Sequence, residues 1–138
     1  CSETSAVRVV DLPPGDDLRV GRLVGVGLFD FGDVDGIGDE ARLQHPLDVV
    51  WHDGMLYVAD SYNHKVKRLD PATRRCERWL GDGTPGLRDG VGTEARFYEP
   101  GGLAVGRDTL YVADTNNHAI RVVRFQDGAV HTLALRLS

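Results

Sequence analysis

Residues 56–67 read LYVADSYNHKVK, and 54 positions further along residues 110–121 read LYVADTNNHAIR. The match continues upstream at the same offset without a gap, because DGIGDEARLQHP at 35–46 becomes DGVGTEARFYEP at 89–100. So much identity in one order indicates an internal repeat. Repeats are considered first because they determine the architecture of the whole chain.

A third, partial copy of the repeat precedes these two. Residues 5–11 share the pattern of residues 64–70, at a spacing of 59 rather than 54. The five extra residues fit into the loop around 12–17, which contains two prolines and a glycine. We therefore divide the chain into the second half of a unit at 1–28 and two whole units at 29–82 and 83–138, all parts of one larger domain.

Each whole unit contains four short runs with the alternation and composition of strands. Asp53-Gly54 and Asp127-Gly128 are hairpin turn signals, because glycine accepts a positive φ without a steric clash. No stretch keeps a helical period, so the only helical turns we expect lie at 38–43 and 92–97. The predicted strands are 47–51, 55–59, 65–69 and 75–80 in the first unit, and 102–105, 109–113, 119–125 and 129–135 in the second.

Four-stranded units that recur roughly every 40 to 55 residues are typical of β-propeller blades. The predicted fold class is therefore all-β: an incomplete arc of about two and a half propeller blades, each a four-stranded antiparallel sheet. Such an arc leaves sheet faces and edges uncovered. We therefore expect self-association through uncovered blade edges.

The composition excludes several classes of protein. The 138 residues are 41% hydrophobic and 27% charged, which excludes a disordered tail. The apolar runs are short, so we expect no membrane partner. The net charge of -5 makes a nucleic-acid partner unlikely. Two cysteines, Cys1 and Cys76, are too few for a disulfide framework, and we interpret Cys76 as a small buried hydrophobic residue.

Residues 56–67 and 110–121 resemble the NHL repeat, which is named for its Asn-His-Leu signature; the third letter is Lys65 in one copy and Ala119 in the other. The segments 35–46 and 89–100 are similar to one branch of that family, whose propeller follows a thioredoxin-like domain. The resemblance implies a propeller of roughly six blades with the thioredoxin-like domain upstream. The chain has no Cys-x-x-Cys pair, so no redox chemistry is assigned to it.

A recurring Asp, Asn and His signature lies between the second and third strands of each unit. Asp and Asn side chains bond to nearby backbone groups and tolerate turn conformations. An imidazole beside them can hydrogen-bond between adjacent blades. Because the signature recurs, we interpret it as structural, with a ligand role for either histidine as the alternative. Its residues are Asp60, Asn63, His64, Asp114, Asn117 and His118.

Ligand-binding candidates lie just before and within the innermost strand, near a mouth of the central channel. Arg42 and Arg96 belong to the repeated Glu-Ala-Arg segments, and a guanidinium suits a carboxylate or a phosphate. The alternative is that each arginine fixes the crossover by an internal contact. His45, Asp48 and Glu99 are further candidates because the units differ at these positions.

The sequence predicts no catalytic residue, no metal site and no cofactor. The carboxylates around Asp35 fail the EF-hand pattern, because Phe31 and Arg42 occupy its first and last ligand positions. The five histidines show no close metal-binding spacing, and there is no Gly-x-Ser-x-Gly elbow. A basic cluster at 65–78 could suit RNA, but acidic residues interrupt it, and a solvated outer edge is our interpretation.

Two functional hypotheses follow. The first is a binding scaffold for a protein partner or a small ligand on the propeller face, with no catalysis of its own. The second is part of an enzyme, either a metal-dependent propeller lyase or hydrolase, or a redox protein whose catalytic domain lies upstream. We expect a cytoplasmic location. A processed lipoprotein is the alternative reading of Cys1-Ser2, although a cut inside a larger protein fits the repeat better.

Overall fold

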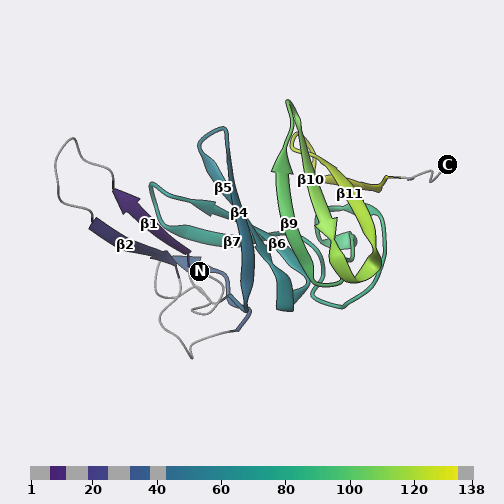
Figure 1. The fold of residues 1–138 in the computed structure, drawn as a ribbon, viewed down its shortest axis with the longest axis horizontal. Helices are drawn as coiled ribbons and strands as arrows, with labels where there is room; N and C mark the ends of the chain where they lie inside the picture. Colours follow the sequence, from purple (N-terminus) through teal and green to yellow (C-terminus); the bar gives the residue numbers. More distant parts are fainter. Residues whose placement is uncertain (1–6, 12–18, 25–31, 38–42, 134–138) are drawn as a thin grey trace.

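The computed structural model describes residues 7–11, 19–24, 32–37 and 43–133. These residues form two five-stranded antiparallel sheets and a separate hairpin of β1 (Val7–Asp11) and β2 (Arg19–Val24) (Figure 1). No α-helix occurs in the described ranges, and three single turns of 3-10 helix join the strands. The predicted all-β arc of propeller blades is confirmed.

The first sheet is a meander with one short strand added at its outer edge. Its strands are β4 (Pro46–His52), β5 (Met55–Asp60), β6 (Lys65–Asp70) and β7 (Arg75–Leu80), and β3 (Gly36–Ile37) pairs with β7. The second sheet repeats this order with β9 (Pro100–Val105), β10 (Thr109–Asp114), β11 (Ala119–Arg124), β12 (Ala129–Thr132) and β8 (Gly90–Val91).

The short strands β3 and β8 correct the expectation of four strands per blade. Both strands lie in crossover segments that the sequence pattern predicts to be solvated loops. Each crossover runs along the outermost strand of its own blade and pairs with it, Val130 opposite Gly90 in the second blade. This pairing satisfies backbone groups that an edge strand would otherwise leave open.

The turns follow the predicted chemistry in part. Asp53 and Gly54 have φ values of 49° and 81°, the pattern of a type I′ hairpin turn. At the second signal only Gly128 has a positive φ, and its amide donates to the Arg124 carbonyl at 2.8 Å. The helical turn expected at 92–97 is a 3-10 turn over Gly92–Glu94, whereas most of its counterpart at 38–43 lies outside the described residues.

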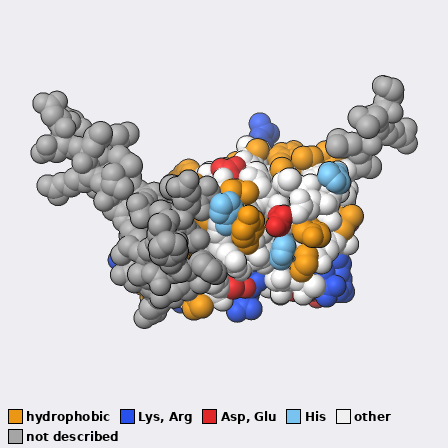
Figure 2. Space-filling model, turned by 60° about the horizontal axis from the view of Figure 1, so that its bottom comes forward, with side chains coloured by type: hydrophobic (Ala, Val, Ile, Leu, Met, Phe, Trp, Pro, Cys, Tyr) orange, Lys and Arg blue, Asp and Glu red, His pale blue; other side chains and the backbone are white. Residues whose placement is uncertain are grey.

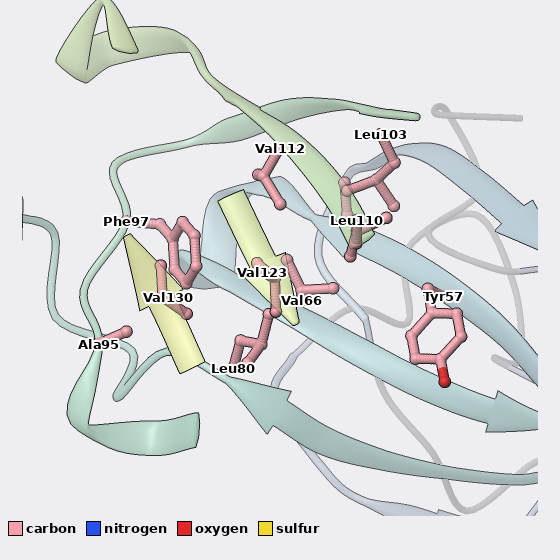
Figure 3. Close-up of a cluster of buried hydrophobic side chains, with 11 residues drawn as sticks. Tyr57, Val66, Leu80, Ala95, Phe97, Leu103, Leu110, Val112, Val123 and Val130 are labelled. Carbon is pink, nitrogen blue, oxygen red and sulfur yellow. The ribbon is translucent and has the colours of Figure 1, made fainter. Parts of the chain in front are cut away.

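The main hydrophobic core lies between the two sheets. Alternation on β5 directs Tyr57 and Ala59 to the second sheet and leaves Leu56 and Val58 on the opposite face. Phe97, from the crossover between the blades, is fully buried against side chains of both sheets (Figure 3). The interface between the blades is therefore a continuous core.

A smaller core backs the far face of the first sheet, formed by Leu43, Val58, Leu69 and Cys76 with Leu56 packed against it. Burial raises the pKa of the Cys76 thiol to about 12. The thiolate is the reactive form of cysteine, so this side chain is a packing residue at neutral pH.

The strand directions give the molecule two distinct ends. The crossover end carries the starts of β4 and β9 and the 3-10 turns Ser61–Asn63 and Thr115–Asn117. The hairpin end carries the β4–β5 and β9–β10 turns and lies at the top of Figure 1. None of the described helices is long and apolar enough to cross a membrane.

Candidate functional site

A buried ionic cluster fixes the crossover end of the first blade. Asp60 is fully buried and accepts hydrogen bonds from the Gln44 amide at 2.7 Å and from the Asn63 side chain at 2.7 Å. The Lys67 ammonium lies 2.8 Å from the same Asp60 carboxylate and 2.9 Å from Asp33. Lys65 also bonds to Asp33. The cluster joins β5, β6 and the incoming crossover.

The second blade contains the same cluster with Arg121 in place of lysine. Asp114 accepts from the Tyr98 amide at 2.8 Å, from Asn117 at 2.7 Å and from Arg121 at 2.9 Å. The Arg121 guanidinium also donates to Asp89 at 3.1 Å. The guanidinium also donates to two crossover carbonyls, those of Arg96 at 2.6 Å and Arg88 at 2.7 Å. It lies over the ring of Phe97, 4.8 Å from the centroid.

Lys67 and Arg121 are the residues that sequence reasoning missed. The placement of Lys65 and Lys67 on a solvated outer edge is wrong, because both are buried and Lys67 is fully so. The physical reason is that a charge can be buried when counter-ions and hydrogen bonds surround it. The available signal was a basic residue seven positions after the signature Asp in both units.

The ionic cluster sets the protonation of its members. Burial alone would lower the pKa of Lys67, but Asp60 and Asp33 outweigh it and raise that pKa. Burial alone would raise the pKa of Asp33, but Lys65 and Lys67 outweigh it and lower that pKa. Both groups are therefore charged at neutral pH, as a structural ion pair requires.

His64 contacts the next blade. It ends the 3-10 turn in the left-handed conformation, with φ of 57°, and its Nδ1 accepts a hydrogen bond from the Glu99 amide at 3.0 Å. Its ring meets Tyr98 edge-on at 5.5 Å between centroids. The nearby Ser61 hydroxyl donates to the Pro100 carbonyl at 2.5 Å. The equivalent Thr115 and His118 border a shallow hollow at the open side of the second blade.

Two of the predicted channel-mouth residues make internal contacts. The Asp48 carboxylate accepts from the Val49 amide and from the Leu103 amide of β9, each at 2.8 Å, and thereby links the inner strands of the two blades. Arg96 donates through Nε to Asp82 at 2.7 Å, within the crossover. Arg42 lies outside the described residues.

The other two channel-mouth residues, His45 and Glu99, stand at equivalent positions and carry different chemistry. Both have a left-handed backbone, with φ of 55° and 51°. The His45 ring stacks on Tyr62 at 4.6 Å between centroids, while Glu99 accepts a hydrogen bond from Asn116. Positions 62 and 116 are again equivalent in the repeat. We call these two contacts the variable pairs.

The crossover end thus displays aromatic, imidazole and carboxylate groups on a repeated frame. Figure 2 tilts this end toward the reader and shows histidine, acidic and hydrophobic side chains side by side. Within the ranges that the structure describes, no three His, Cys, Asp or Glu side chains converge as a metal site would require. The arrangement suits hydrogen bonding and stacking with a bound partner.

Comparison of the sequence with known proteins shows what this chain is similar to. Residues 97–123 match the family described as NHL repeat. NHL repeat-containing protein 2 of Homo sapiens is 48% identical over 144 residues, covering 97% of this chain and 19% of that protein. Protein SUPPRESSOR OF QUENCHING 1, chloroplastic, of Arabidopsis thaliana is 44% identical over 147 residues, covering 98% of this chain and 14% of that protein.

Solved structures share the fold. An auxiliary nutrient binding protein from Bacteroides ovatus superimposes with a TM-score of 0.78 at 23% identity, over 96% of this chain and 34% of that protein. The chain spans about a fifth or less of its curated relatives and about a third of this structural neighbour. The repeat match shows that residues 97–123 form an NHL repeat, the relatives show that nearly the whole chain resembles NHL repeat-containing proteins, and the shared fold shows propeller-type blades.

Proposed function

We propose that this chain is part of a β-propeller that acts as a binding scaffold for a protein partner or a small ligand and has no catalysis of its own. The observation that supports this proposal is that the crossover end combines repeated buried contacts with side chains that differ between the blades. Each frame is a buried ionic cluster built on Asp60 or Asp114, and each display is a variable pair. A repeated frame with blade-specific side chains can present one surface to one partner.

The binding surface that we propose is centred on His45 and Glu99. Asp48 and Arg96 support this surface through their internal contacts, and Arg42, which lies outside the described residues, stays a candidate from the sequence alone. Exposed Tyr62 and Tyr98 add aromatic area beside the variable pairs. Tyrosine is enriched at protein interfaces because it combines apolar area with a hydroxyl, so a protein partner is the better match.

The relatives are several times longer than this chain. Any further activity would therefore be a proposal about residues outside it. The upstream thioredoxin-like domain that the resemblance implies stays a prediction. A nucleic-acid partner loses support, because the first two lysines of the basic cluster form internal ion pairs. Lys65 pairs with Asp33, and Lys67 pairs with Asp60.

The test is site-specific photo-crosslinking in the intact protein. A photoreactive residue replaces Tyr62 or, as a control, Thr73 on an outer turn. A crosslinked partner is identified and purified, and its affinity is measured against Glu99→Gln and the matched variant Glu94→Gln, which removes the same charge from an exposed site. We expect a partner at position 62 only, and a fall in affinity of at least five-fold for Glu99→Gln only. Equal affinities for the two variants, or turnover that depends on His45, would overturn the proposal.

A further inference from the structure

A second candidate surface lies at the hairpin end, opposite the variable pairs. A cleft of about 700 Å³ opens between the β4–β5 turn of the first blade and the β9–β10 and β11–β12 segments of the second. This volume is within the range of roughly 300–1,000 Å³ that small-molecule sites occupy. Met55 and Tyr57 of the first blade and Phe125 of the second contribute to its lining.

Aromatic rings form one wall of the cleft. His52 stacks on Phe125 with 3.9 Å between centroids and 9° between planes, and Trp79 is parallel to Phe125 on a spacing of 5.9 Å. Tyr57 is tilted against both Phe125 and Trp79, at 5.0 and 4.8 Å. His52, Tyr57 and Phe125 line the cleft, whereas Trp79 packs on two of these rings without lining it. Because the lining rings come from both blades and pack on one another, the wall is preorganised.

The charges around the cleft are unbalanced. Arg124 lines it but is paired with Asp127, at 2.5 Å. Asp53 and Asp108 line it from turns of different blades, and neither side chain forms an ion pair or hydrogen bond with another residue in the described part of the chain. Two unpaired carboxylates therefore border an aromatic wall.

We propose that this cleft binds an organic cation, an ammonium or guanidinium group on an apolar stem, presented as a lysine or arginine side chain by a segment of a partner protein. The aromatic wall offers apolar area to the stem, and the two carboxylates supply the charge opposite to that of the cation. Met55 and Phe125 contact the apolar stem. The inference rests on the proposed scaffold role but uses the opposite end of the molecule, so the two can fail separately.

The experiment titrates the intact protein with an end-blocked tetrapeptide that contains one lysine, and follows the ¹³C-methyl resonance of Met55. Met55 is the single methionine of this chain, and Met55→Leu assigns its signal. The same peptide with norleucine in place of lysine keeps the stem and removes the charge. Free n-butylammonium tests whether the cation needs a peptide. Asp53→Asn/Asp108→Asn tests the carboxylates, and Glu94→Gln is the control for loss of charge at an exposed site.

We expect a saturable shift of the Met55 signal with the lysine peptide, and affinity at least five-fold weaker for Asp53→Asn/Asp108→Asn and for the norleucine peptide. Glu94→Gln retains wild-type affinity. Asparagine tolerates the left-handed backbone at position 53, so this substitution adds no backbone strain there. An absent shift, or equal binding of the lysine and norleucine peptides, would overturn the cation site while leaving the crossover end untouched. Tighter binding of n-butylammonium than of the peptide would overturn the protein segment as its source.

Discussion

Two basic side chains are completely buried in the described part of this fold, although burial of an unpaired charge is strongly unfavourable. Lys67 and Arg121 are fully buried, and each meets the signature Asp of its own blade together with an acidic residue of the incoming crossover. The signature Asp is thus the counter-ion of a buried cation and an acceptor for backbone amides. This double use explains why the repeat needs a carboxylate there and not only a turn residue.

The residue scale gives a first prediction. Asp114→Ala leaves the Arg121 guanidinium buried beside an incomplete set of partners, and we expect a loss of about 3–5 kcal/mol in the free energy of unfolding. Urea unfolding followed by tryptophan fluorescence measures it. Asp127→Ala removes an exposed ion pair with Arg124 and a hydrogen bond from the Ala129 amide, and should lower the unfolding midpoint clearly less. Similar midpoints for the two variants would contradict the claim that Asp114 stabilises the fold as the counter-ion of Arg121.

Acidification provides a second prediction at this scale. Because the pKa of Asp33 is lowered below its usual value of 3.8, its ionised form stabilises the fold. That contribution is present above the unfolded pKa and is lost as the pH falls through the lowered folded pKa. Asp33→Asn should therefore be less stable than the wild type at pH 7, and the difference should shrink below pH 3.8. Urea titrations at several pH values check this, and a difference that is constant down to pH 2 would refute it.

Individual residues were only partly predictable from the sequence. Local spacing was enough to place Asp60 and Asn63 in one turn, because the bonds involved span three residues. The burial of Lys67 depends on Asp33, which lies 34 positions away, and charge alone argues for exposure. The hydrogen bond from the Leu103 amide to Asp48 likewise depends on how the two blades pack. The sequence pattern of a single repeat does not contain this information.

At the scale of elements, the crossover between blades is the piece that joins the sheets. Residues 95 to 97 run between them, and alternation buries Ala95 and Phe97 while it leaves Tyr98 exposed. The eight main strands were predictable because hydrophobic alternation and turn signals mark them. The two-residue strands β3 and β8 were not, because two residues carry no alternation.

The buried aromatic of the crossover gives a third prediction. Phe97→Ala removes a ring from the core shared by both blades, and we expect a loss of about 3–5 kcal/mol in stability. The neighbouring Tyr98→Ala removes a ring of similar size that is 40% exposed, and should cost clearly less. Thermal unfolding by circular dichroism compares the two. A larger effect at Tyr98 would mean that the crossover does not insert between the sheets as described.

At the scale of the whole molecule, the second blade has an apolar face that nothing in the described chain covers. Tyr111 is 41% exposed, whereas the equivalent Tyr57 is 7% exposed because the second blade covers it. Thr115 and His118 stand on this open face, where their counterparts Ser61 and His64 contact the next blade. The face therefore has the form of an interblade surface without its partner.

An uncovered interblade surface predicts association of the 138-residue chain. Copies bury the open face against one another, because exposed apolar sheet favours contact and each copy presents the same face. Sedimentation velocity over a range of concentrations should give a mean mass that rises from 15.1 kDa. Ile120→Lys places a charge on the face and should shift association to higher concentration, while Thr73→Lys, which adds the same charge on an exposed outer turn, should not. If the wild-type chain keeps the monomer mass at the highest concentration, the face is closed by a rearrangement within the chain, and the open face described here is not the one present in solution.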